Sequence, residues 1–191
     1  IDLIITSSSR GVKRLKSWGV PKTMICIVPI GVDVKTFIPL KKEQKNFLIK
    51  KYNIPKNQTI LGSFQKDGVG WGRGENPKLI KGPDIFIEVV KELKKITNPF
   101  IILTGPARGF IIKELKKLNI RYLYINASAK TQIAELYNLL DYYFICSREE
   151  GGPKGLMESM ACGVTVISNK VGMADTLIKN GKNGYLSDFK S

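Results

Sequence analysis

Residues 150–163 read EGGPKGLMESMACG, and the fold is best approached from this stretch. The apolar run over 142–146 that precedes it is typical of a buried strand. Pro153 suits the first position of a helix, apolar residues then recur at helical spacing, and Gly163 is placed to end the helix. The stretch therefore predicts a strand, a glycine loop and a helix. The amino end of such a helix favours a bound anion, because its free N–H groups and its dipole converge there.

Two glutamates bracket this helix end. Glu150 lies in the loop, and Glu158 lies about a turn and a half inside the predicted helix. A carboxylate does not hold phosphate, but it accepts hydrogen bonds from sugar hydroxyls. Amides for a phosphate and carboxylates for a diol together suggest a nucleotide sugar. Spacing alone leaves the alternative open that this is an ordinary strand–loop–helix turn of an α/β protein.

Composition narrows the classes of function. The 191 residues carry a net charge of +15, which favours an anionic partner such as a nucleotide, an acidic membrane surface or nucleic acid. The alternative is that the lysine pairs only keep helix surfaces soluble. The chain has no histidine, which excludes a histidine base, a histidine metal ligand and a Ser-His-Asp site. It also lacks an Asp-x-Asp pair, so we expect no metal in the site.

The cysteines and the lack of a long apolar run indicate the cellular compartment of the protein. Cys26, Cys146 and Cys162 lie in apolar contexts without metal-ligand spacing, and we expect them to be reduced core residues. The sequence has no leader-like start and no apolar run long enough to span a bilayer. We expect a fragment of a soluble, cytoplasmic protein, with a peripheral contact to an acidic membrane left open.

Strand and helix signals alternate from about residue 59 to the end. This alternation predicts an α/β fold with a doubly wound, Rossmann-like parallel sheet. Ligands in such sheets lie beyond the carboxyl ends of the strands, here the loops after Phe64 and Cys146. The predicted strands are 59–64, 100–104, 121–125, 142–146, 164–168 and a short one near 185, with further strands at 2–6 and 24–28 and a lysine-rich helix at about 41–51.

A long glycine-rich loop, residues 65–82, follows the strand at 59–64. Its glycines have neither the Gly-x-Gly-x-x-Gly spacing of dinucleotide-binding folds nor the spacing of a P-loop. Long loops of this kind are usually functional or mobile. The loop carries four cations, Lys66, Arg73, Lys78 and Lys81. The sequence thus predicts cations on one loop of the ligand edge and carboxylates on the other.

Four segments resemble the GT-B glycosyltransferases of family 4, the glycosyl transferases group 1. Residues 150–158 match the family's E-x7-E motif, and residues 81–84 (KGPD) match its K-G-x-D segment. Residues 28–39 resemble the crossing segment between the two domains, with Ile30 where asparagine is usual. Residues 171–175 resemble the G-G-x-x-E turn, with Asp175 for glutamate. The resemblance implies a C-terminal donor domain at 40–191, an interdomain crossing at 29–39, and a tail of the N-terminal domain at 1–28.

The resemblance implies retaining transfer of a sugar from a nucleotide sugar to an acceptor, without a metal or other cofactor. Lys81 would stabilise the leaving diphosphate, Glu150 would hold hydroxyls of the donor sugar, and Glu158 would hold the ribose diol. The acceptor would be bound by the missing N-terminal domain, so this chain alone would bind a nucleotide but transfer no sugar. The other residues implied for the donor are Gly151, Gly152, Lys154, Gly155 and Leu156 for sugar and phosphate, and Ile125 and Asn126 for the base.

One position departs from the family's pattern. Ser63 stands where the family has an arginine for the donor diphosphate, so the second phosphate cation is unassigned. Lys66 is the first candidate because it lies just beyond the strand, with Lys78 and Arg73 behind it. Three other functions stay open: a GT-B domain of the sugar-nucleotide epimerase kind, a basic nucleic-acid-binding α/β module, and a non-catalytic sugar-binding domain. We expect no specific nucleic-acid partner.

Overall fold

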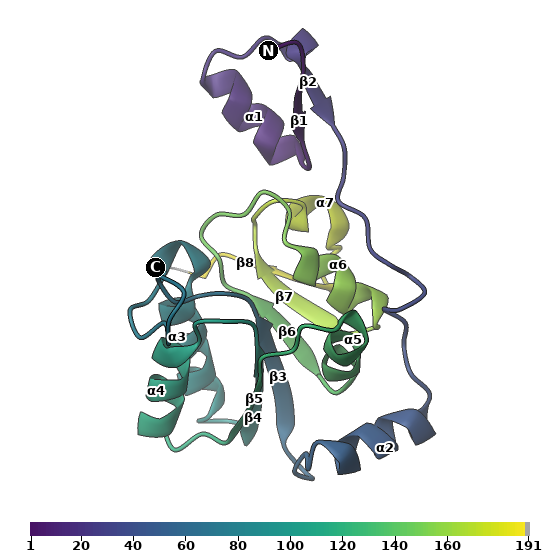
Figure 1. The fold of residues 1–191 in the computed structure, drawn as a ribbon, viewed down its shortest axis with the longest axis vertical. Coiled ribbons are helices and arrows are strands. Elements are labelled where there is room, and N and C mark those ends of the chain that lie inside the picture. The colour runs from purple at the N-terminus through teal and green to yellow at the C-terminus, as the bar shows by residue number, and fades with distance from the viewer. Residues whose placement is uncertain (190–191) are drawn as a thin grey trace.

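The computed structural model describes residues 1–189, and its main feature is a six-stranded sheet in which all strands run parallel (Figure 1). The strand order is β5-β4-β3-β6-β7-β8. The chain therefore starts in the middle, builds outward to β5, and returns to build the other half from β6. This order confirms the predicted doubly wound sheet and puts its switch point between β3 and β6. The bounds are β3 Thr59–Phe64, β4 Pro99–Thr104, β5 Tyr122–Ile125, β6 Tyr142–Ile145, β7 Thr165–Asn169 and β8 Gly184–Ser187.

Helices cover both faces of this sheet. On one face, α3 (Pro83–Leu93) and α4 (Gly109–Lys117) pack against alternate residues of the central strands, such as Ile101 and Leu103. On the other face, α5 (Lys130–Asn138) and α6 (Lys154–Ala161) pack against residues such as Ile102. All six residues of β4 are buried, as a strand covered on both faces requires. The helix α2 (Lys42–Lys51) and the short α7 (Ala174–Leu177) also contribute to the second face.

The first residues form a small unit that lies apart from the sheet (Figure 1). The strands β1 (Ile4–Thr6) and β2 (Ile25–Ile27) pair in parallel, and between them lie α1 (Ser9–Ser17) and a 3-10 turn, η1 (Lys22–Met24). Ser8 caps α1 by accepting a hydrogen bond from the Gly11 amide. No residue of α1 is buried, and Trp18 just beyond it is 71% exposed. An irregular segment, residues 28–41, leads from this unit to α2.

Three details differ from the sequence-based predictions. Pro153 is the cap of α6 and not its first residue, because its ψ of 111° is extended. Cys26 is only half-buried, since it lies on β2 of the two-stranded sheet, outside both cores. The turn expected at 171–175 runs into a short helix, because Ala174 and Asp175 are the first residues of α7. In the described part of the chain, every helix is too short or too polar to cross a membrane.

Candidate functional site

A cavity of about 350 Å³ opens at the switch point, where the carboxyl ends of β3 and β6 meet the start of α6. The loops after β3, β4 and β6 supply its rim, which is where ligands of doubly wound sheets lie. The two loops that the sequence analysis singled out therefore do meet. The lining residues are Phe64, Gln65, Lys66, Lys81, Thr104, Gly105, Pro106, Ala127, Ile133, Tyr137, Tyr143, Ile145, Glu150, Gly152, Pro153, Lys154, Gly155 and Glu158.

The amino end of α6 faces this cavity. Its cap, Pro153, makes no side-chain hydrogen bond to the helix. Within residues 1–189, the backbone N–H groups of Lys154 and Gly155 have no hydrogen-bond partner. Gly155 leaves no room for a side chain, because a Cβ there would lie 2.3 Å from the Tyr143 hydroxyl. The helix end thus offers two free amides and the positive end of its dipole to a ligand in the cavity.

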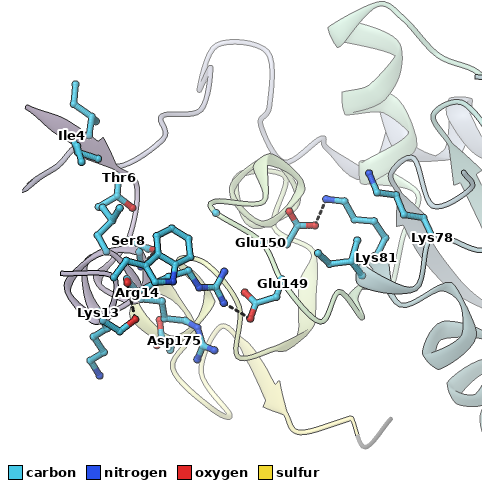
Figure 2. Close-up of a pocket in the computed structure, with 18 residues that line it drawn as sticks. Ile4, Thr6, Ser8, Lys13, Arg14, Lys78, Lys81, Glu149, Glu150 and Asp175 are labelled. Carbon is cyan, nitrogen blue, oxygen red and sulfur yellow. Dashed lines mark hydrogen bonds and ion pairs between the residues drawn. The ribbon is translucent and has the colours of Figure 1, made fainter. Parts of the chain in front are cut away.

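Lys81 and Glu150 form an ion pair at the mouth of the cavity. The Lys81 Nζ lies 2.6 Å from Glu150 Oε1, and the two side chains are only 26% and 13% exposed (Figure 2). The Ser147 hydroxyl donates to the same carboxylate oxygen at 2.8 Å. The lysine from the glycine-rich loop and the first glutamate of the 150–158 motif are therefore in direct contact. An anionic ligand placed here meets a cation whose position the glutamate sets.

A second ion pair, between Arg148 and Asp84, joins the loop after β6 to the first turn of α3. Arg148 donates to both carboxylate oxygens of Asp84, at 2.9 and 2.7 Å, and its backbone amide donates to the Ile80 carbonyl at 2.9 Å. The hydrogen bonds from the Arg148 side chain lower the pKa of Asp84. Gly82, between Ile80 and Asp84 in the chain, has a left-handed backbone with φ of +62°. A Cβ on Gly82 would lie 2.0 Å from the Cys146 carbonyl oxygen. The K-G-x-D segment thus packs closely against the end of β6, and this packing fixes the backbone position of Lys81.

Glu158 lines the same cavity and contacts one ring of a cluster of three aromatic side chains. The Tyr137 hydroxyl donates to Glu158 Oε2 at 3.2 Å. Burial raises the pKa of Glu158 above its ordinary value. Tyr137 also contacts Phe64 and Tyr143, with ring centroids 4.6 and 5.2 Å away. This end of the cavity therefore combines an apolar floor with one half-buried hydrogen-bond acceptor, which suits a ribose better than a phosphate.

Lys66 is the glycine-rich-loop cation that lines this cavity together with Lys81. Its ammonium group lies 3.5 Å from the centroid of the exposed Trp71 ring. Ser63, by contrast, is fully buried and its hydroxyl accepts a hydrogen bond from Arg108 at 3.3 Å. Of the two other cations proposed from sequence, Lys78 lines a different cavity and Arg73 lines neither cavity.

The remaining sequence-predicted residues are dispersed around the site. Gly152, Lys154 and Gly155 line the cavity, whereas the side chain of Leu156 is buried in the core. Ile125 and Asn126 lie just before Ala127, which does line the cavity. Ala127 also donates its amide to the Thr104 hydroxyl at 3.2 Å. Gly151 faces the neighbouring larger cavity.

That larger cavity, of about 890 Å³, lies between the N-terminal unit and the loops around Lys81 and Glu150 (Figure 2). Arg14 of α1 pairs with Glu149 at 2.5 Å across it. The Ser7 hydroxyl donates to the Gly151 carbonyl oxygen at 2.7 Å. Lys81 and Glu150 line both cavities, so this ion pair stands where the two meet. Within residues 1–189, no group of three or more Asp, Glu, Cys or His side chains is arranged to hold a metal ion.

Sequence reasoning missed several residues that shape the site. Tyr137 carried no signal for the site in the sequence, and its hydrogen bond to Glu158 was not foreseen. Arg108 forms a fully buried ion pair with Asp67 of the glycine-rich loop. The pairing of Arg148 with Asp84 joins residues far apart in the chain. Only Asp84, as part of the K-G-x-D segment, carried a signal in the sequence.

The model of the family "glycosyl transferases group 1" matches residues 77–191, more than half of the chain. The chain belongs to the group 1 glycosyltransferases. The matched part contains Lys81, Glu150 and Glu158, whereas most of the glycine-rich loop precedes it. The resemblance stated from the motifs is thereby confirmed.

Curated relatives of this group 1 glycosyltransferase chain are named transferases. A D-inositol 3-phosphate glycosyltransferase of Xylanimonas cellulosilytica is 23% identical, over 98% of this chain and 45% of the relative. An N,N'-diacetylbacillosaminyl-diphospho-undecaprenol alpha-1,3-N-acetylgalactosaminyltransferase of Campylobacter jejuni is 25% identical, over 93% and 44%. The chain thus spans less than half the length of these relatives.

Solved structures share the fold. Sucrose-phosphate synthase of Thermosynechococcus elongatus superimposes with a TM-score of 0.78 at 18% identity, over all of this chain and 46% of the other. Anabaena HepE, solved in complex with UDP and glucose, gives 0.79 at 20% identity, over 97% and 49%. The C-terminal domain of a group 1 glycosyltransferase of Francisella tularensis gives 0.63 at 26% identity, over 84% and 82%. The fold is therefore that of GT-B C-terminal domains.

Proposed function

We propose that this chain is the donor-binding part of a retaining, metal-independent glycosyltransferase, and that its cavity at the switch point holds a nucleotide sugar. The observation that carries the proposal is the ion pair of Lys81 and Glu150, which lines both cavities. In a transfer reaction, the donor's anomeric carbon must lie where donor and acceptor meet. A diphosphate on one side of that point and a sugar beside the carboxylate satisfy this requirement.

The chemistry of each end of the cavity assigns the parts of the donor. The diphosphate would accept hydrogen bonds from the free amides of Lys154 and Gly155, with Lys81 neutralising the charge that develops as the bond to the sugar breaks. Glu150 would orient sugar hydroxyls beside this lysine. Glu158, with Tyr137 donating to one of its oxygens, would accept from the ribose diol at the other end. In this proposal, side-chain cations and a helix end replace a metal ion.

The larger cavity is the proposed place of the acceptor. It lies between the N-terminal unit and the Lys81–Glu150 pair, so an acceptor bound there faces the donor sugar. We assign residues 1–28 to the N-terminal domain of the whole enzyme, 29–39 to the crossing, and 40–191 to the donor domain. The exposed side of α1 and the share of the chain covered by the Francisella tularensis domain support this division. Sugar transfer is accordingly proposed for the whole enzyme, and nucleotide binding for this chain.

Thermal unfolding with nucleotides tests the proposal, because a ligand that binds only the native state raises the melting temperature. UDP, GDP, ADP and their sugar conjugates should be compared with the matching nucleosides, each with and without EDTA. UDP is the first choice, since the Anabaena relative was solved with UDP and glucose. We expect at least one diphosphate to stabilise the chain more than its nucleoside, unchanged by EDTA.

Two results of this experiment would contradict the proposal. Stabilisation by none of the nucleotides, together with salt-dependent retention on heparin, would support the nucleic-acid-binding alternative and refute the proposal. Stabilisation that EDTA abolishes would refute its metal-independent part.

A further inference from the structure

Arg108 is a fully buried arginine that lies directly before α4, beneath the start of the glycine-rich loop. Its Nη1 donates to three backbone carbonyl oxygens, those of Ser63 at 2.7 Å, Gln65 at 2.6 Å and Thr104 at 3.0 Å. Ser63 and Thr104 lie at the carboxyl ends of β3 and β4, and Gln65 is the first residue of the loop. One guanidinium group therefore ties the loop to two neighbouring strands.

Asp67 faces the same guanidinium from the loop. Its Oδ2 lies 3.0 Å from Arg108 Nη2, and both side chains are 0% exposed. Within residues 1–189, neither carboxylate oxygen accepts a hydrogen bond. Burial raises the pKa of Asp67 to about 6 despite the arginine beside it. Because desolvation offsets so much of the attraction in such a pair, stability alone is a weak reason for it.

The ion pair instead fixes the position of the first residues of the glycine-rich loop. Gln65 and Asp67 are both held by Arg108, and Lys66 lies between them. The rest of the loop is fastened to the start of α4, where the amide of Gly109 donates to the Arg73 carbonyl at 2.7 Å. The loop also packs closely on the residue before Arg108. A Cβ on Gly68 would lie 2.4 Å from the Ala107 carbonyl oxygen, so there is no room for a side chain at Gly68. Arg108 and the contacts at the start of α4 thus fix the position of the Lys66 backbone at the cavity wall.

A diphosphate carries more than one negative charge, and a single lysine neutralises only one of them. Lys81 is already partly neutralised by Glu150, at 2.6 Å. Lys66 and Lys154 line the cavity and form no ion pair with a carboxylate within residues 1–189. The ammonium group of Lys66 is held only over the Trp71 ring, a contact that a nearby phosphate exceeds in strength. Lys66 is therefore free to turn from the indole to an anion.

We propose that Lys66 is the second cation for the donor diphosphate and that Arg108, paired with Asp67, is the positioning residue that holds it at the cavity. The inference rests on the proposed function, because it presumes that a nucleoside diphosphate binds there. It assigns a role to the glycine-rich loop, most of which lies outside the family match.

A double-mutant cycle on the whole chain tests the positioning role. The variants are Lys66→Ala, Gly68→Ala and both together, each titrated calorimetrically with UDP and with uridine. Gly68→Ala displaces the loop, because the added Cβ would clash with the Ala107 carbonyl oxygen and with the Gly74 backbone, and it changes no charge. Gly72→Ala in the same loop is the matched control, because a Cβ there meets nothing within 4 Å. Arg108→Lys serves as the second displacing variant should Gly68→Ala fail to fold. It keeps the positive charge but loses the branched guanidinium group that holds the loop.

We expect Lys66→Ala and Gly68→Ala each to weaken UDP binding by about tenfold, with uridine binding unchanged. The double variant should bind UDP no more weakly than Lys66→Ala, since both changes remove the same contact. Gly72→Ala should bind as the wild type does.

Folded variants that keep full UDP affinity would overturn the inference, and so would losses that multiply in the double variant. The two hypotheses fail differently. If the wild type binds UDP and needs Lys81 but not Lys66, only this inference is wrong. If the wild type binds no nucleotide, both are wrong.

Discussion

Replacement of Lys81 by alanine removes the cation at the junction of the two cavities. A charge-assisted hydrogen bond contributes about 1.5–3 kcal/mol, so the lost contact alone should weaken UDP binding by about tenfold to a hundredfold. A second effect follows from the structure. Glu150 is only 13% exposed and would be left beside the diphosphate without its cation. Its repulsion adds to the loss, whereas uridine, which carries no phosphate, should bind as before.

The two contributions can be separated. Glu150→Gln in the Lys81→Ala background removes the repulsion and should recover part of the UDP affinity, but not all of it. Lys116→Ala is the matched control, because Lys116 is exposed on α4 and lines neither cavity. The fold should lose only about 1 kcal/mol in Lys81→Ala, since Ser147 still donates to Glu150.

Isothermal titration of UDP and uridine into each variant measures these effects. Equal losses for UDP and uridine in Lys81→Ala would show that Lys81 supports the fold of the site and does not contact the diphosphate. An unchanged UDP affinity would refute the reasoning altogether.

Two further predictions concern residues around Lys81 and Glu158. Gly82→Ala should destabilise the fold by more than about 2 kcal/mol, because it adds a clash with the Cys146 carbonyl to left-handed strain. Gly181→Ala, with a similar φ but open space, is its control in chemical denaturation, and equal losses would contradict the clash. Glu158→Gln should raise the melting temperature at pH 7 but not at pH 4. Burial raises the pKa of Glu158 above its ordinary value, so its carboxylate costs stability at pH 7, where it is ionised, but not at pH 4, where it is mostly protonated in both the folded and the unfolded state. An equal gain at both pH values would contradict this.

The sheet and its ligand edge were predictable because their signals are local. The strand at 59–64 has the predicted bounds, and the apolar strand predicted at 100–104 is β4, which is buried on both faces. Gly163 ends α6 with φ of +76°, as a glycine after a helix does. The loops that meet at the site followed from the alternation of strands and helices.

The contacts inside the site were not predictable, because they join residues distant in sequence. Nothing near Arg108 indicated that its guanidinium would reach the carbonyls of Ser63 and Gln65. Asp67 was overlooked because an aspartate in a glycine-rich loop is normally solvated, whereas the loop here folds over it. Cys26 was assigned to the core because its short apolar run resembled a covered strand, and its sheet has only two strands. Such features depend on packing, which periodicity does not report.

The central claim is that a nucleoside diphosphate binds at the amino end of α6 between the two loops. Amide chemical shifts of the isotopically labelled chain, recorded as UDP is added, test it most directly. The claim predicts the largest changes at Lys154, Gly155, Lys66 and Lys81, with the changes at the two loop lysines absent when uridine replaces UDP. Changes spread over the exposed lysines of α2 and α4, with none at Lys154 and Gly155, would contradict it.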